Sequence, residues 1–135
     1  MSDERVEGGC FCGKVRYEAR GQTENSMVCH CASCRRVAGA PVVAWLTFPV
    51  DRFRFTKGEP VEFRSSAPVT RTFCGDCGTP LTYRNDRHPG TIDVTTATLD
   101  RPETYPPTHH SWLSDDVAWV HFGDGLPAFQ QSRPA

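Results

Sequence analysis

The sequence predicts a mainly β domain of short antiparallel strands with one or two short helical turns. Apolar and polar residues alternate over several short runs, as they do in half-buried strands. The 11 glycines and 11 prolines suit many strands joined by turns, and no long run has the 3.6-residue period of a helix. The seven cysteines fall into three groups and, being odd in number, cannot all pair as disulfides within one chain. Their grouping favours a role as metal ligands, since a bound metal would stabilise a domain with a small core.

Length and charge narrow the class of protein. A chain of 135 residues is expected to fold as one domain over residues 1–135. The 15 basic and 16 acidic residues give a net charge of -1, which does not indicate nucleic acid or an anionic membrane as a partner. The start, Met1 to Arg5, is polar, and no run reaches the length of a membrane helix, so we expect neither a signal peptide nor a membrane span. A cytoplasmic protein with reduced thiols is the expectation.

The strands are identified by alternation or by β-branched and apolar runs. Val15, Tyr17 and Ala19 lie on one side of a segment whose other side is charged. The run from Val42 to Phe48 is continuously apolar, which is typical of a strand buried on both faces. Strands are predicted over residues 6–9, 14–20, 26–29, 42–48, 52–55, 61–64, 69–73, 81–84 and 92–96.

The connections carry recognisable breakers. Ala32 to Val37 is predicted to make one or two helical turns, ended by Gly39 and Pro41. A turn over residues 57–60 predicts that the strands on either side of it form a hairpin. Its inward side chains would be Phe53, Phe55, Val61 and Phe63.

The last third of the chain has a weaker pattern. Three prolines between Arg101 and Pro107 predict an extended connection rather than a helix. Beyond it, Trp112, Trp119 and Phe122 are interpreted as core residues or as a lid over a pocket.

Two of the cysteine groups have the spacing of a closed, four-thiolate metal site. Cys74 and Cys77 have two intervening residues and a glycine following each, and Cys10 and Cys12 supply a second pair with one intervening residue. A glycine after a cysteine can adopt positive φ and lets backbone N–H groups approach the thiolates. Such a set would hold zinc tetrahedrally and leave no position for solvent. A redox pair at Cys74 and Cys77, or simple buried thiols, are the competing interpretations.

The third group, Cys29, Cys31 and Cys34, lacks a fourth ligand. Cys29 and Cys31 would share one face of a strand, with His30 on the other, and Cys34 would turn back from the helical segment. Three protein ligands and one open position are typical of catalytic zinc, so these cysteines are the candidate catalytic residues. A histidine would instead make the site structural; the candidates are His30, His109, His110 and His121.

An open three-thiolate zinc suits the binding of a further, exchangeable thiolate, which the metal would deprotonate. A small-molecule thiol is therefore the expected partner. Arg35 and Arg36 could offset the charge of the thiolates or grip a carboxylate, or they could be ordinary surface arginines.

Several segments together carry a family resemblance. They are Gly8 to Tyr17, Cys29 to Arg36, Gly39 to Pro41, Phe73 to Leu81, and an ending with His110, Trp119 and Asp124 to Pro127. These segments resemble the glutathione-dependent formaldehyde-activating (GFA) family, which includes the centromere protein V group.

The resemblance implies a single GFA-like domain with a zinc-bound, tent-like β fold. It implies two zinc ions per chain, a structural one on Cys10, Cys12, Cys74 and Cys77 and a catalytic one on Cys29, Cys31 and Cys34. The implied reaction adds the thiol of glutathione to formaldehyde, giving S-hydroxymethylglutathione, and is classed as a carbon–sulfur lyase reaction. The alternative that the centromere protein V group allows is a non-catalytic zinc-binding interaction module.

Overall fold

The computed structural model describes residues 4–134, which form two β-sheets and one short helix. Residues 1–3 of the polar start, and Ala135, lie outside the described residues. Single 3-10 turns occur at Val50–Arg52, Thr96–Thr98, Pro102–Thr104 and Leu113–Asp115. The main elements are β1 (Val6–Gly9), β2 (Arg16–Ala19), β3 (Asn25–Cys29), α1 (Ala32–Ala38), β4 (Val43–Pro49), β5 (Phe53–Lys57), β6 (Val61–Ser66), β7 (Val69–Phe73), β8 (Pro80–Asn85), β9 (Thr91–Thr95) and β10 (His109–Ser111).

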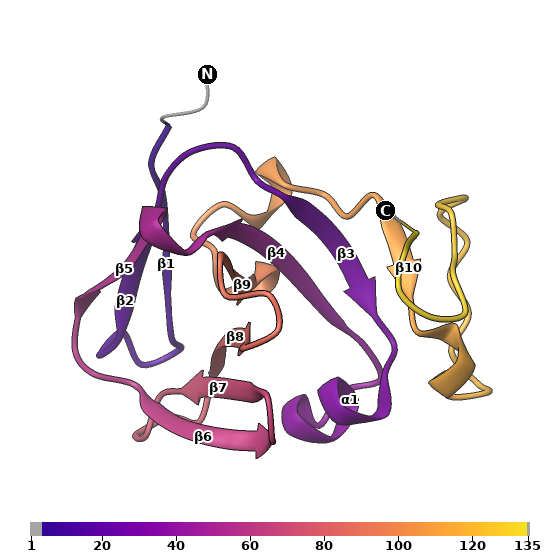
Figure 1. The fold of residues 1–135 in the computed structure, drawn as a ribbon, viewed down its shortest axis with the longest axis horizontal. Helices are drawn as coiled ribbons and strands as arrows, with labels where there is room; N and C mark the ends of the chain where they lie inside the picture. The colour runs from indigo at the N-terminus through magenta and orange to yellow at the C-terminus, as the bar shows by residue number, and fades with distance from the viewer. Residues whose placement is uncertain (1–3, 135) are drawn as a thin grey trace.

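The strands form one small and one large sheet (Figure 1). The small sheet has the order β1-β2-β5, and the large one has the order β10-β3-β4-β9-β8-β7-β6. Neighbouring strands are antiparallel except β10 and β3, which run parallel. The mainly β prediction with one short helix is confirmed, and α1 begins at the expected residue. The parallel pair is the exception to the antiparallel expectation.

Strand β4 shows how the large sheet serves two purposes. Leu46 and Phe48 are fully buried and belong to the main core, which also contains Tyr17 and Ala19 of the small sheet. The alternate residue Trp45 is 4% exposed and belongs to a second cluster with Cys29 and Cys34. The predicted burial of this strand on both faces is therefore confirmed. One face of the sheet contributes to the main core, and the other contributes to the second cluster.

The predicted hairpin between the strands on either side of residues 57–60 is wrong. Strand β5 pairs with β2 in the small sheet, whereas β6 pairs with β7 in the large one. Val61, expected to face inward, is 43% exposed. Alternation identifies which residues form a strand and which side is apolar, but it does not identify the partner strand. The turn instead carries the chain from one sheet to the other.

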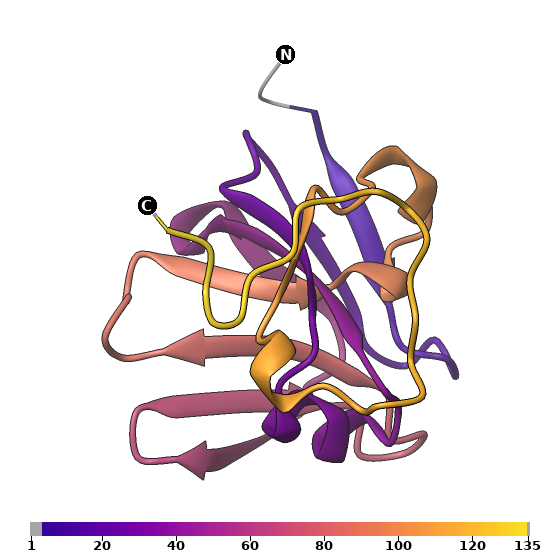
Figure 2. The same cartoon turned by 90° about the vertical axis from the view of Figure 1, so that its right-hand side faces the viewer.

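The end of the chain runs along the outer edge of β3 (Figure 2). Strand β10 pairs there, although its short sequence has no clear strand pattern. The expected extended connection contains a single 3-10 turn at Pro102–Thr104. Trp119 is 71% exposed and Phe122 47% exposed, so neither is a core residue, whereas Trp112 packs against the second cluster.

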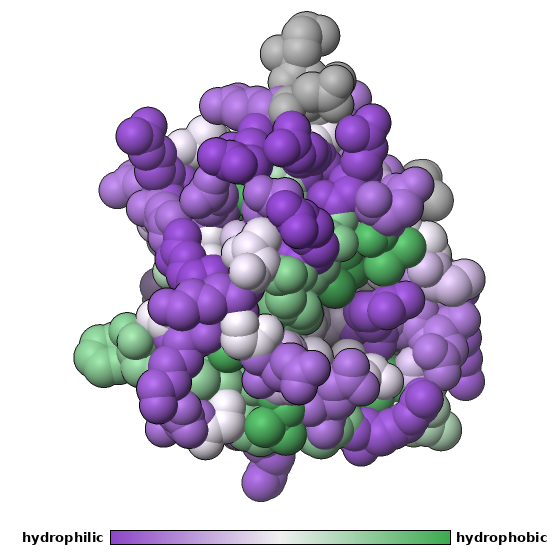
Figure 3. Space-filling model, turned by 90° about the vertical axis from the view of Figure 1, so that its left-hand side faces the viewer, coloured by the Kyte–Doolittle hydropathy of each residue, from purple (hydrophilic) through white to green (hydrophobic). Residues whose placement is uncertain are grey.

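Two features describe the apolar content of the helices and of the surface. Within residues 4–134, no helix is long and apolar enough to cross a membrane. The face on the side of the small sheet is mainly hydrophilic, and its apolar side chains form only small patches (Figure 3).

Gly58 lies in the turn that carries the chain from β5 of the small sheet to β6 of the large one. Its φ is +70°, and a Cβ atom there would lie 2.2 Å from the backbone oxygen of Lys14. We expect Gly58→Ala to lower the free energy of unfolding by about 2–4 kcal/mol, because it combines a left-handed conformation with a backbone clash. Chemical denaturation measures the difference. The matched control is Gly90→Ala, where no atom lies within 4 Å of the added Cβ, and equal effects of the two substitutions would contradict the prediction.

Candidate metal centres and their cavity

The fold brings the seven cysteines into two clusters. Cys10, Cys12, Cys74 and Cys77 form one, and Cys29, Cys31 and Cys34 form the other; within each cluster all sulfur atoms lie within 4.8 Å of one another. Thiolates about 2.3 Å from a tetrahedral zinc ion lie roughly 3.8 Å apart. In the first cluster the Sγ atoms of Cys10 and Cys12 are 3.6 Å apart, and those of Cys12 and Cys74 are 3.8 Å apart. Both clusters fit metal sites.

Two similar turns build the four-cysteine cluster. In each, the N–H of a glycine bonds back to the first cysteine's carbonyl: Gly13 to Cys10 at 3.1 Å and Gly78 to Cys74 at 2.8 Å. Both glycines have a φ of +81°, which other residues rarely adopt. The predicted positive φ is thus found in the glycines that follow Cys12 and Cys77 but not in Gly75, which follows Cys74.

Thr79 joins the two turns. Its hydroxyl accepts a hydrogen bond from the N–H of Phe11 and lies 3.2 Å from the sulfur of Cys77. Hydrogen bonds from the Thr79 side chain and backbone lower the pKa of Cys77 to about 5, which favours the thiolate. Cys10 and Cys74 are buried in the main core. Cys12 is exposed and Cys77 is half-buried, so the cluster connects β1 of the small sheet to β7 of the large one at the edge of the core.

The three-cysteine cluster forms where β3 passes into α1. Cys29 is the last residue of β3, and Cys34 is the buried residue of the helix. Cys31 is the N-cap of α1, and its sulfur accepts a hydrogen bond from the N–H of Cys34 at 3.3 Å. A sulfur here takes the place of the usual serine or aspartate oxygen. The thiols of Cys29 and Cys34 hold the pKa of Cys31 well below its usual range, and the N–H of Cys34 adds to this effect.

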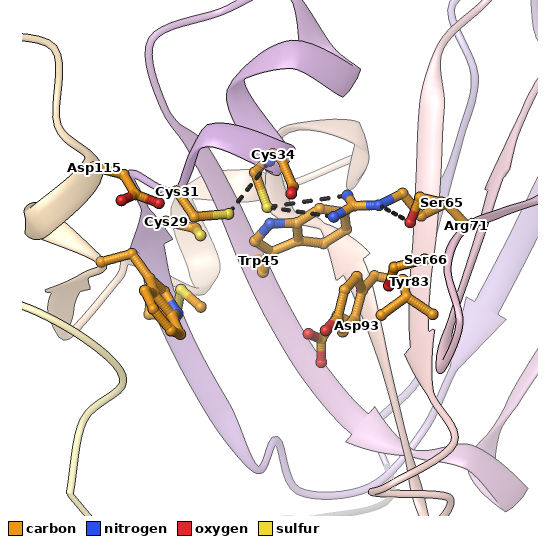
Figure 4. A pocket seen from close by; sticks show the side chains of 14 residues that line it. Cys29, Cys31, Cys34, Trp45, Ser65, Ser66, Arg71, Tyr83, Asp93 and Asp115 are labelled. Atoms are coloured by element: carbon orange, nitrogen blue, oxygen red, sulfur yellow. Dashed lines mark hydrogen bonds between the residues drawn. The ribbon is translucent and has the colours of Figure 1, made fainter.

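A cavity of about 380 Å³ opens beside these three sulfur atoms (Figure 4). The concave face of the large sheet forms its floor, including Trp45, Tyr83 and Asp93, and the tip of the β6–β7 hairpin forms one rim. Trp112 forms part of the opposite wall and is the only non-glycine residue with positive φ among residues 4–134, at 64°. Such a conformation costs about 1 kcal/mol or more and is enriched at functional sites.

Arg71 supplies the positive charge of this cavity. It is 4% exposed, and its Nη1 and Nη2 atoms donate to the sulfur of Cys34 at 4.0 and 3.9 Å. Its Nε donates to the hydroxyl of Ser65 at 3.0 Å, and its guanidinium lies over the ring of Tyr83. A buried arginine so placed offsets the negative charge of the thiolates.

Asp93 is the ionisable group on the cavity floor that lacks an ion pair among the described residues. Its Oδ1 accepts a hydrogen bond from the hydroxyl of Thr47 at 2.6 Å on the neighbouring strand. Burial raises the pKa of Asp93 to about 6, against the opposing effects of Thr47 and of the charge of Arg71. At neutral pH this carboxyl is therefore mainly ionised.

The histidines lie elsewhere. His30 points away from the three sulfur atoms, and its ring bonds to Asp116 at 3.0 Å and to His110 at 2.9 Å. His110 in turn bonds to Asp124 at 2.9 Å, and His109 bonds to the hydroxyl of Thr108. None of the cavity-lining residues is a histidine, and His121 is exposed. The chain of hydrogen bonds from His30 instead fastens the end of the chain to the start of α1.

Sequence analysis did not identify two charged residues that line the cavity, Arg71 and Asp93. Arg35 and Arg36, the expected partners of the thiolates, do not line the cavity, and Arg36 is exposed. Arg71 and Asp93 do line it. Their signal was a charge at an interior position of a β-branched or apolar strand, where an unpaired charge would be costly.

With this geometry in place, comparison with known proteins identifies the family. Residues 5–115 match the family described as glutathione-dependent formaldehyde-activating enzyme. The chain belongs to this family. The matched region contains both cysteine clusters, Arg71 and Asp93.

Individual relatives add less detail. An uncharacterized lyase of Schizosaccharomyces pombe is 30% identical over 91 residues, which are 65% of each protein, so the match leaves about a third of that relative uncovered. A Rhodobacter sphaeroides protein of known crystal structure is 19% identical, with a TM-score of 0.59 over 91% of this chain and 98% of that one. The second likeness shows a shared fold.

The raised pKa of Asp93 predicts a pH-dependent stability difference. The folded protein favours the protonated carboxyl, so between pH values of about 4 and 6 the folded state binds more protons than the unfolded state. The free energy of unfolding should therefore fall with rising pH by about 2–3 kcal/mol relative to Asp93→Asn. Denaturant titrations across this range measure it. The exposed Asp51→Asn is the control, and parallel curves for the wild type and Asp93→Asn would refute the assignment.

Arg71 is expected to support metal binding. Arg71→Met removes the cation next to Cys34 but keeps much of the side chain's volume, so we expect zinc affinity at the three-cysteine site to fall about 10–100-fold. Competition with a chromophoric chelator measures the affinity. The exposed Arg84→Met on β8 is the control, and unchanged affinity in Arg71→Met would show that the guanidinium does not stabilise the thiolates.

Proposed function

We propose that each cysteine cluster holds one zinc ion, with different roles. Cys10, Cys12, Cys74 and Cys77 would hold a structural ion, and Cys29, Cys31 and Cys34 a catalytic one. The support is the donor set: four sulfur atoms within 4.8 Å of one another at the edge of the main core, and three sulfur atoms beside a cavity. A four-thiolate site has no free position, whereas a three-thiolate site keeps one.

The proposed reaction is the addition of a thiol, such as glutathione, to formaldehyde or another small electrophile, which makes the protein a zinc-dependent carbon–sulfur lyase. Zinc on three thiolates would supply a coordination position for the substrate thiol and would lower that thiol's pKa. Arg71 would limit the negative charge that accumulates when a further sulfur approaches Cys34. Trp45 and Trp112 would exclude water from the reacting groups, because their rings line the cavity on two sides.

The observation that carries this proposal is the position of the three sulfur atoms. They lie together at one end of a cavity whose lining, within residues 4–134, offers no histidine or further cysteine to complete the set. A site whose fourth position opens into a cavity is built to exchange a ligand. The family match over residues 5–115 and the related lyase support the same class of reaction.

Two other expectations follow from the same chemistry. The site needs reduced thiols, which is the condition of the cytoplasm. We treat residues 1–135 as one domain, since the family match spans both sheets.

Removing one cysteine from each cluster tests the division of roles. Cys34→Ser should keep the fold and lose one zinc ion, together with activity, because the three-cysteine site lies outside the main core. Cys74→Ser should destabilise the protein by several kcal/mol, because its site connects the two sheets and structural zinc contributes folding free energy of about 10 kcal/mol in small domains. Metal analysis with thermal denaturation measures both. If Cys34→Ser unfolds the protein as completely as Cys74→Ser does, the open-site proposal is wrong.

The reaction itself is tested by product formation. The zinc-loaded protein, mixed with glutathione or a simpler thiol and with formaldehyde, should speed formation or breakdown of the hydroxymethyl adduct, followed by exchange NMR. Cys34→Ser is the inactive control. Two bound zinc ions without any effect on adduct exchange would support the non-catalytic interaction module instead.

A further inference from the structure

The charges that line the cavity are unbalanced. Arg71 is its one cationic side chain among the described residues, whereas Asp93 and Asp115 contribute carboxyl groups beside the three thiols. Figure 4 shows Asp115 on the side of Cys31 and the guanidinium of Arg71 across from Cys34, with Asp93 beside Tyr83 on the cavity floor. Three thiolates with a zinc ion would still carry one net negative charge, and a bound substrate thiolate would add another.

Arg71 is already committed to groups of the protein. It donates to Cys34 through both terminal nitrogens and to Ser65 through Nε, and its flat face covers the ring of Tyr83. Being 4% exposed, it has little surface left for a substrate. A thiol that brings carboxylates into this cavity would meet Asp93 and Asp115 without a free cation to pair with. Burial of such an unpaired anion is costly.

Asp93, by contrast, has unused capacity. Thr47 donates to its Oδ1, while the structure gives its Oδ2 no hydrogen-bond or ion-pair partner among residues 4–134. A carboxylate accepts several hydrogen bonds, so a half-satisfied carboxylate on the cavity floor suits a cationic donor. Because the pKa of Asp93 stays below neutrality, the group is charged at physiological pH. Asp115 is exposed at the rim and adds negative potential along the entrance.

We propose that the thiol bound at the three-cysteine site is a small amine-bearing thiol without carboxylates, whose ammonium group binds Asp93. The sulfur would enter the open position beside Cys29, Cys31 and Cys34, and the amine would lie on the cavity floor. This inference rests on the proposed function, and it narrows the substrate from thiols in general to aminothiols in preference to glutathione.

Equilibrium binding tests the charge preference without turnover. Cobalt replaces zinc as a visible probe, and the closed four-cysteine site provides an internal reference that no thiol should alter. The probes are 2-aminoethanethiol, 2-mercaptoethanol, 3-mercaptopropionate and glutathione, titrated against the change in cobalt absorption. We expect 2-aminoethanethiol to bind about tenfold more tightly than 2-mercaptoethanol, the scale of a partly desolvated ion pair, and the two anionic thiols to bind more weakly than 2-mercaptoethanol.

Two variants identify the group responsible. Asp93→Asn should bring the affinities of 2-aminoethanethiol and 2-mercaptoethanol to within about twofold of each other, while the exposed Asp51→Asn should preserve the preference. If Asp93→Asn does not fold, the wild-type series alone decides.

The possible failures are distinguishable. If the wild type binds 3-mercaptopropionate or glutathione as tightly as 2-aminoethanethiol, or more tightly, the aminothiol inference is overturned and the proposed function still stands. A preference that survives Asp93→Asn also overturns it. No spectral change with any thiol overturns the open metal site, and with it both proposals.

Discussion

The four sulfur atoms of Cys10, Cys12, Cys74 and Cys77 lie within 4.8 Å of one another and bring segments 62 positions apart into contact. They lie where the end of β1 in the small sheet meets the turn after β7 in the large one. The two sheets are otherwise joined by side-chain packing and by connecting segments. The three-cysteine cluster and its cavity lie apart from the four-cysteine cluster, on the face of the large sheet that does not contribute to the main core.

This face of the large sheet carries side chains that line the cavity. Because side chains alternate along a strand, β4 sends Leu46 and Phe48 to the core and Trp45 to the cavity. Asp93 lies opposite both Thr47 and Tyr83 on its neighbouring strands, and Arg71 lies opposite Tyr83 on the next pair. A single row across four strands thus places an acid, an aromatic ring and a cation on one floor beside the cysteines.

The end of the chain holds this arrangement from outside. The linked side chains of Asp116, His30, His110 and Asp124 fasten it to the segment that carries Cys29 and Cys31. His30 is thereby turned away from the sulfur atoms, as strand alternation predicts. The N–H groups of Trp112 and Leu113 donate to the backbone carbonyls of Gln131 and Phe129. These bonds hold the backbone of Trp112 in its left-handed conformation at the cavity wall.

The class of fold, most strands, the helix after Cys31 and the grouping of the cysteines could be predicted from the sequence, because each is encoded by neighbours within a few residues. The structure was needed to show that β5 and β6 belong to different sheets, that β10 pairs parallel to β3, and that Arg71 and Asp93 line the cavity beside the cysteines. These depend on contacts between residues tens of positions apart, which local periodicity does not record. A charge within an apolar strand was the one local sign of the cavity, and the fold gave that sign its meaning.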